Sequence, residues 1–172
     1  MTEALIMLVD SHVLPYGHHR SLKEWRETVL WTLDVNDVFH SNSDSLHDIY
    51  NRCLIAPSKI LSKDSIFEIF CKHKDELQMP DKDVGLAFSC SKMTVIDEVD
   101  GGSRKYNKIT FVEFLDFLGR LSQAKFDGSE LADIPLAEKI EFLLSDLLEH
   151  FGHKLQKVHV EIHDETESDS DY

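Results

Sequence analysis

Cysteine, proline and glycine are scarce in this chain, and each scarcity argues against a class of protein. The three cysteines, Cys53, Cys71 and Cys90, are odd in number, lie far apart and form no C-x-x-C pair. We therefore expect buried free thiols rather than disulfides or a metal site. Only four prolines and seven glycines occur in 172 residues. That composition favours helices over a loop-rich or disordered fold.

Long apolar runs and the common catalytic signatures are missing as well. No apolar run approaches the roughly 20 residues of a membrane-spanning helix. The N-terminal segment MTEALIMLVDSHV has no basic region and no small-residue cleavage site, so we expect a soluble, cytoplasmic protein without a membrane partner. The patterns G-x-S-x-G and H-E-x-x-H and a phosphate-binding glycine loop do not occur. The ten histidines complete no strong metal-ligand spacing. We expect neither enzymatic activity nor a cofactor.

Basic residues are outnumbered, with 18 Lys and Arg against 32 Asp and Glu, and the formal net charge is −14. Such a charge disfavours binding to nucleic acid or to anionic membranes. Six of the acids fall in residues 161–172, which contain no Lys or Arg. Residues 156–172 are therefore predicted to be a disordered acidic tail. Within it, Thr166, Ser168 and Ser170 are bracketed by acids and are candidate phosphorylation sites.

Hydrophobic residues at helical spacing cover most of the chain and predict an all-α fold. The pattern is strongest in PLAEKIEFLLSDLLEHFG, which places Pro135 at a helix start. We divide the chain into an N-terminal apolar helix (1–19), a linker helix (20–42), a paired helix-loop-helix domain with a closing helix (43–155) and the tail. In the linker, Trp25, Val29 and Leu33 are predicted to share one face.

The two apolar ends of the chain are similar to each other. Residues 2–19, TEALIMLVDSHVLPYGHH, align with residues 137–154, AEKIEFLLSDLLEHFGHK, with identities at Gly17/Gly152 and His18/His153. If this similarity reflects a repeat, the chain begins with the closing helix of a preceding module and then contains a second, complete one. The sequence leaves open whether it is part of a longer tandem-module protein.

The stretch YNKITFVEFLDFLGRL (106–121) matches the end of a calcium-binding EF-hand loop and its exit helix. Such a loop takes ligands from positions 1, 3, 5, 7, 9 and 12. With Ile109 at position 8 and Glu113 at position 12, positions 1, 3 and 5 become Gly102, Arg104 and Tyr106. One carboxylate beside a guanidinium cannot hold calcium, so the loop is predicted to be vestigial. The alternative is an irregular loop that binds calcium through Asp97, Asp100 and Glu113.

The same template fits a second loop upstream, although more weakly. Leu61 takes position 8, Ser62 position 9 and Ser65 position 12, and none of the positions 1, 3 and 5 offers a carboxylate. The features common to both loops are the hydrophobic residue at position 8, the helix cap and the apolar exit helix. We therefore expect two paired, degenerate EF-hands.

The chain resembles a divergent EF-hand-like family of ciliated and flagellated organisms. The likeness rests on VGLAFSCSKMTVIDEV, KITFVEFLDFLGRLS and PLAEKIEFLLSDLL, and also on EWRETVLWTLDVNDVF and LVDSHVLPYG. The matching positions are Ala87, Phe88, Ser91, Met93, Thr94, Asp97, Glu98, Phe111, Glu113, Phe114 and Leu115. This resemblance covers about 130 residues and implies paired degenerate EF-hands in a non-enzymatic, axonemal protein. The chain departs from the family in having no complete first module.

These patterns predict a structural or adaptor protein that binds another protein. Paired EF-hands often hold an amphipathic partner helix in an apolar groove. Candidates to line such a groove are Met79, Phe88, Met93, Phe114 and Phe117; the alternative places the same side chains in the core. Two other functions stay open, a calcium sensor and a regulatory subunit of an enzyme complex. The sequence does not indicate an oligomeric state.

Overall fold

A computed structural model describes residues 22–55, 58–72, 77, 79–93 and 106–158, and this part of the chain is mostly helical, as the all-α prediction requires. The N-terminal half contains α3 (Leu22–Trp25), η2 (Arg26–Leu30), α4 (Leu33–Ser41) and α5 (Ser43–Arg52). A two-residue strand, β1 (Leu61–Ser62), leads into α6 (Lys63–Phe67) and η3 (Glu68–Lys72). The remaining elements are α7 (Asp81–Ser91), β2 (Lys108–Ile109), α8 (Phe111–Phe126) and α9 (Leu136–His150).

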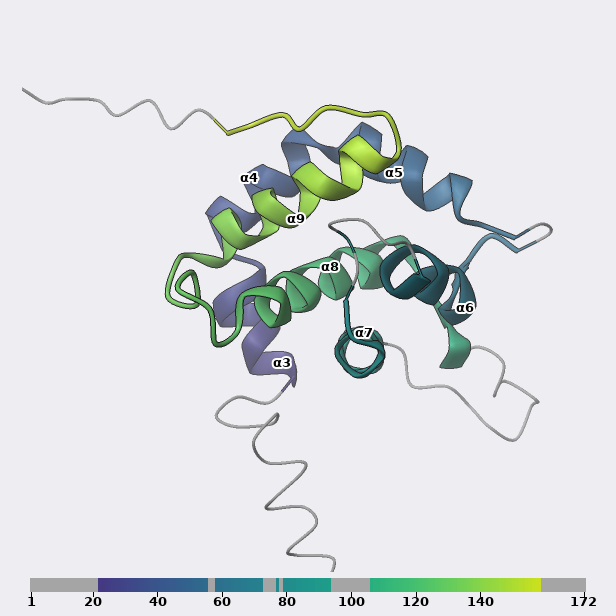
Figure 1. The fold of residues 1–172 in the computed structure, drawn as a ribbon, viewed down its shortest axis with the longest axis horizontal. Coiled ribbons are helices and arrows are strands. Elements are labelled where there is room, and N and C mark those ends of the chain that lie inside the picture. Colours follow the sequence, from purple (N-terminus) through teal and green to yellow (C-terminus); the bar gives the residue numbers. More distant parts are fainter. Residues whose placement is uncertain (1–21, 56–57, 73–76, 78, 94–105, 159–172) are drawn as a thin grey trace, which may run out of the picture.

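Helix α8 runs through the centre of the molecule, with α9, α4 and α5 on one side and α6 and α7 on the other (Figure 1). It is long and apolar enough to contact both groups, and it buries Phe114, Phe117, Leu118 and Leu121. Helix α9 is the closing helix that the leucine spacing predicts. It buries Ile140, Leu143, Leu144, Leu147 and Leu148. The core therefore forms around α8, and the other helices cover it.

The predicted linker helix is interrupted in the structure. Helix α3 continues as the π-helical turn η2, which ends at Leu30, and Thr32 is extended before α4 begins at Leu33. This break turns the buried face, so Leu33, which was expected to lie on the same face as Trp25 and Val29, is 75% exposed. The buried residues of α4 are instead Val35, Val38 and Phe39.

The boundary of the predicted tail also differs from the structure. Residues 156–158 are part of a segment, 153–158, that follows α9 and packs against the helices. We call residues 153–158 the C-terminal strap. The remaining tail with its candidate phosphorylation sites, the N-terminal helix 1–19, and the candidate ligands Asp97 and Asp100 lie outside the described residues.

Candidate functional site

The two loops meet in a short antiparallel sheet. Strand β1 pairs with β2, and Leu61 is the partner of Ile109, the two residues that the sequence assigns to position 8. Both side chains are fully buried. The hydroxyl of Tyr50 on α5 joins the two strands, because it donates to the Ile109 carbonyl at 2.9 Å and accepts from the Leu61 N–H at 3.3 Å. Burial raises the pKa of this phenol. The two loops are thus held together by the sheet and by one side chain.

Each strand leads directly into a capped helix. At the start of α8, the Thr110 hydroxyl accepts from the Glu113 N–H, and the Glu113 carboxylate accepts from the Thr110 N–H at 2.8 Å. At the start of α6, the Ser62 hydroxyl accepts from the Ser65 N–H at 3.2 Å. These caps satisfy N–H groups that have no partner inside the first turn of a helix.

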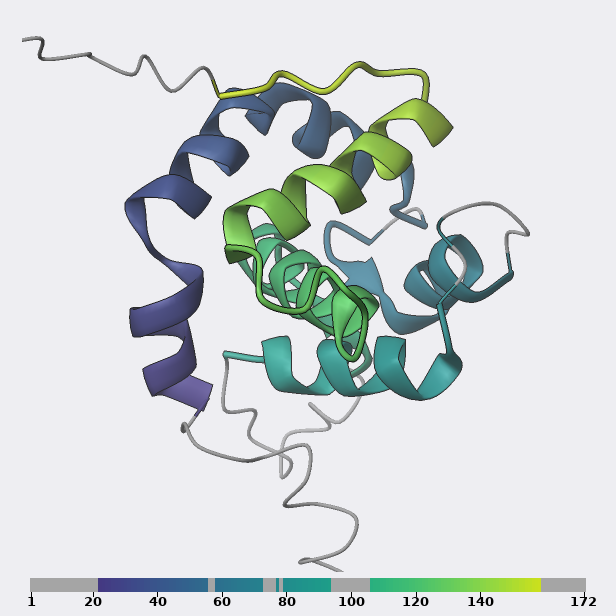
Figure 2. The ribbon, with the colours of Figure 1, turned by 60° about the vertical axis from the view of Figure 1, so that its left-hand side comes forward.

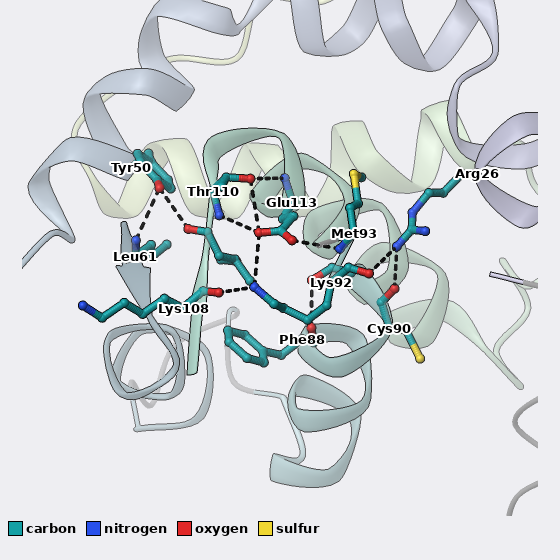
Figure 3. A network of polar contacts seen from close by, with 12 residues as sticks. Arg26, Tyr50, Leu61, Phe88, Cys90, Lys92, Met93, Lys108, Thr110 and Glu113 are labelled. Carbon is teal, nitrogen blue, oxygen red and sulfur yellow. Dashed lines mark hydrogen bonds and ion pairs between the residues drawn. The ribbon is translucent and has the colours of Figure 1, made fainter. Parts of the chain in front are cut away.

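The Glu113 carboxylate is the centre of a buried polar network (Figure 3). Besides the Thr110 N–H, it accepts a hydrogen bond of 2.8 Å from the Met93 N–H and lies 3.3 Å from the Lys92 ammonium. The same ammonium donates to the main-chain carbonyl of Lys108. Residues from the end of α7, from β2 and from the start of α8 therefore meet at one carboxylate.

The environment of Glu113 favours its charged form. Burial raises the pKa of this carboxyl, but the two N–H groups and the Lys92 ammonium outweigh burial, so its pKa lies below its ordinary value. The Glu113 residue is 2% exposed and the Lys92 side chain is 15% exposed, so water screens their attraction weakly. The carboxylate has its hydrogen bonds and its counter-charge supplied entirely by the chain.

Lys92 contacts two of the atoms that an EF-hand loop would offer to calcium. With Ile109 at position 8, Lys108 holds position 7, whose ligand is a main-chain carbonyl, and Glu113 holds position 12. The Lys92 ammonium donates hydrogen bonds to the Lys108 carbonyl and to the Glu113 carboxylate. An ammonium is a compact cation with three donors. It therefore supplies positive charge and directed hydrogen bonds to these two groups.

A second buried ion cluster anchors the segment that carries Lys92. Arg26 and Arg120 both contact the fully buried Asp116 carboxylate, Arg120 at 2.6 Å. Burial raises the pKa of Asp116, against the influence of the two guanidinium groups. Arg26 also donates to the carbonyls of Cys90 at 2.9 Å and Lys92 at 3.1 Å, at the end of α7. It thereby fixes the backbone from which the Lys92 side chain reaches Glu113.

The sequence patterns did not identify Lys92, Arg26 or Asp116 as parts of this site. Asp116 and Arg120 do have the i, i+4 spacing of a helical ion pair, and this spacing could have indicated that Asp116 is paired. Arg26 lies 90 residues from Asp116 along the chain, and Lys92 lies 21 residues from Glu113. No local pattern predicts contacts over such separations.

Four of the five groove candidates are core residues in this structure. Met79, Phe88, Phe114 and Phe117 are at most 7% exposed, and Met93 is 39% exposed. Their side chains lie inside the fold, where α8 is covered by α9 on one side and by α7 on the other. Their burial agrees with the alternative that the sequence left open, in which aromatic and methionine side chains fill the core.

The described residues contain no group of three or more His, Cys, Asp or Glu side chains placed to hold a metal ion. The three cysteines are free and half-buried. Burial raises the pKa of Cys53 and Cys71 to about 11, and that of Cys90 also lies above its ordinary value. The thiols are consequently protonated near neutral pH and are poor nucleophiles.

Comparisons of the chain with protein-family models, with curated proteins and with solved structures found no match. Among the helices that the structure describes, none combines the length and the apolar character needed to cross a membrane. The contacts of Lys92 and Glu113 are therefore the main basis for assigning a function.

Proposed function

We propose that this chain is a calcium-independent structural or adaptor protein, built on two EF-hand-like helix pairs and without enzymatic activity. The first pair is α5 with α6 and η3, and the second is α7 with α8. A single observation carries the proposal: the Lys92 ammonium donates hydrogen bonds to the Lys108 carbonyl and to the Glu113 carboxylate. In our interpretation this ammonium replaces calcium permanently.

The physical argument concerns what sets the arrangement of the helices. In a calcium sensor, the ion stabilises the open arrangement of a helix pair, and its release reverses the change. A cation that belongs to the chain cannot diffuse away. The helix arrangement is then fixed by Lys92 and by core packing, and the protein presents one surface at any calcium concentration.

The contacts between the loops add support. The residues at position 8 are partners in the sheet, Tyr50 joins both strands, and both exit helices keep a side-chain cap. These features stabilise the paired loops without a bound metal ion. A protein that had lost the need for calcium but still used the surface formed by the helix pairs would retain them.

The adaptor role and the cellular location are the less direct parts of the proposal. Both come from the resemblance to the EF-hand-like family of ciliated and flagellated organisms, which implies a protein partner and a place in the axoneme. An amphipathic helix is the kind of partner that paired EF-hands usually bind.

Calcium titration tests the central statement. We expect calorimetry of the 172-residue chain, with magnesium present at physiological salt, to detect no binding heat, and calcium to leave the melting temperature unchanged. The variant Glu113→Gln should likewise show no binding heat and no change of melting temperature with calcium. Its side chain keeps a similar shape and loses only the charge, which makes it the matched control.

Binding at micromolar calcium that Glu113→Gln abolishes would contradict the proposal. It would establish the alternative, in which an irregular loop recruits Asp97 and Asp100, and the chain would be a calcium sensor. Weak binding that Glu113→Gln leaves intact would point to the acidic tail instead, and the proposal would stand.

A further inference from the structure

The C-terminal strap leaves α9 through a well-defined turn. Gly152 has a positive φ of 79°, and the N–H groups of Gly152 and His153 donate to the carbonyls of Glu149 and Leu148 at 2.9 and 2.7 Å. This is a Schellman motif, which ends the helix and reverses the direction of the chain. Figure 2 shows the strap (yellow) running back from the end of α9 along α4 and α5.

Asn42, at the junction of α4 and α5, binds the backbone of the strap. Its side-chain amide accepts from the Gln156 N–H at 2.8 Å and donates to the Gln156 carbonyl at 3.0 Å. The same amide also donates to the Val38 carbonyl at 2.9 Å, which holds it in place. Asn42 is only 1% exposed, whereas Gln156 itself is exposed. A buried carboxamide thus pairs with both main-chain groups of Gln156, and these two hydrogen bonds do not involve the glutamine side chain.

Contacts on either side of Asn42 complete the site. The His153 imidazole lies 2.8 Å from the Asp48 carboxylate on α5, and the hydrogen bond between them contributes to a lowered pKa of Asp48. Leu155 and Val158 pack against the core cluster. The strap is therefore recognised by backbone hydrogen bonds, by one carboxylate and by apolar contacts.

We propose that the surface of α4, α5 and α9 around Asn42 is a binding site for an extended peptide. The C-terminal strap is the ligand that occupies this site in the structure. Recognition through backbone groups is how extended segments bind to proteins that tolerate varied sequences. A competing segment of a partner protein would be extended, with a histidine or basic residue for Asp48 and an apolar residue beside the one that faces Asn42. This inference holds whether or not the helix pairs are EF-hand-like.

A tethered ligand has a large advantage over a free one. A short linker gives an effective concentration of the order of millimolar. A free peptide should therefore bind the unaltered chain poorly and should bind well once the strap is released. The site would be closed in the isolated protein and opened by whatever removes the strap.

The experiment uses the 172-residue chain and two variants at one position. Gln156→Pro removes the N–H that donates to Asn42 and should release the strap, whereas Gln156→Ala keeps the backbone groups and should not. The probe is a fluorescent synthetic peptide with the sequence of residues 152–158, GHKLQKV, followed by anisotropy. We expect the Gln156→Pro chain to bind it at least about tenfold more tightly than the unaltered and Gln156→Ala chains.

A control on the peptide itself distinguishes specific binding through the Gln156 backbone from non-specific binding. A probe carrying the Gln156→Pro change should lose binding to the released site, because it lacks the same N–H. Hydrogen exchange of the unaltered chain should show a protected Gln156 amide.

Three outcomes would overturn the proposal. They are an unprotected Gln156 amide, equal binding of the two peptides, and a folded Gln156→Pro chain that fails to bind the probe. If Gln156→Pro unfolds the domain, the strap is a structural part of the fold and not an exchangeable ligand, which overturns it as well.

Discussion

At the scale of single residues, the two buried carboxylates of the described residues are neutralised by other parts of the same chain. Glu113 has two backbone N–H donors and the Lys92 ammonium as partners. Asp116 has two guanidinium groups. Removing one partner of a buried pair is costly, because the other is left charged with neither water nor a counter-charge. These two carboxylates should therefore be the most sensitive polar positions in the described part of the chain.

Lys92→Met tests this expectation. The change keeps most of the side-chain volume and removes the charge, so Glu113 loses one charged hydrogen bond. We expect the free energy of unfolding to fall by about 1.5–3 kcal/mol, measured by urea denaturation. The control is Lys23→Met, where the lysine side chain is 82% exposed, and its effect should stay within about 0.5 kcal/mol.

A double-mutant cycle shows whether the loss comes from the pair itself. Combining Lys92→Met with Glu113→Gln should cost less than the two single changes added together, with a coupling of about 1 kcal/mol or more. Additive effects would mean that Lys92 acts through packing alone.

At the scale of elements, the close approach of η2 to α8 depends on one glycine. A Cβ at Gly119 would lie 2.3 Å from the Leu30 Cδ1 atom, and Leu30 is fully buried. Helix α7 contains the contrasting case. A Cβ at Gly85 would lie 3.6 Å from the Phe67 ring, which is an ordinary van der Waals contact.

The two glycines should therefore respond to alanine with opposite signs. Gly85→Ala should raise the free energy of unfolding by about 0.5–1 kcal/mol, because alanine favours helix over glycine. Gly119→Ala should lower it by about 1–3 kcal/mol, because the added methyl group displaces Leu30. Chemical denaturation measures both. Stabilisation by Gly119→Ala would show that η2 shifts easily and that its packing on α8 is loose.

At the scale of the whole molecule, ion pairs and hydrogen bonds join segments that are distant in sequence. Arg26 and Asp116 are separated by 90 residues, and Asn42 and Gln156 by 114. Glu113 connects the end of α7 to the start of α8. Because these contacts are distributed across the fold, a change in the charge of one buried carboxylate should alter the stability of the whole domain.

The acid unfolding of the protein should reflect Glu113. Its pKa in the folded state lies below the ordinary value of 4.5, so in this range the unfolded chain binds the proton more readily. The stabilisation is therefore fully present above pH 4.5 and is lost as pH falls through the lowered pKa. Melting temperatures measured across this range should rise with pH. The rise should be smaller in Glu113→Gln, and equal slopes in the two proteins would contradict the assignment.

Much of the helical framework was determined by the sequence itself. The leucine spacing of α9, the caps at Ser62 and Thr110 and the hydrophobic residues Leu61 and Ile109 were identified from local patterns. These features depend on residues within a turn or two of each other. Their physical causes, helical periodicity and the unpaired N–H groups of a first turn, act over that same distance.

Only the tertiary structure decided how the ends of these helices are used. It changed the direction of the linker at Thr32, placed the backbone of Gln156 against Asn42, and brought the Lys92 ammonium to Glu113. The sequence patterns gave no indication of the contact between Lys92 and Glu113. This contact joins side chains from different elements. Its existence depends on how α7 and α8 pack together, and no pattern along the chain contains that information.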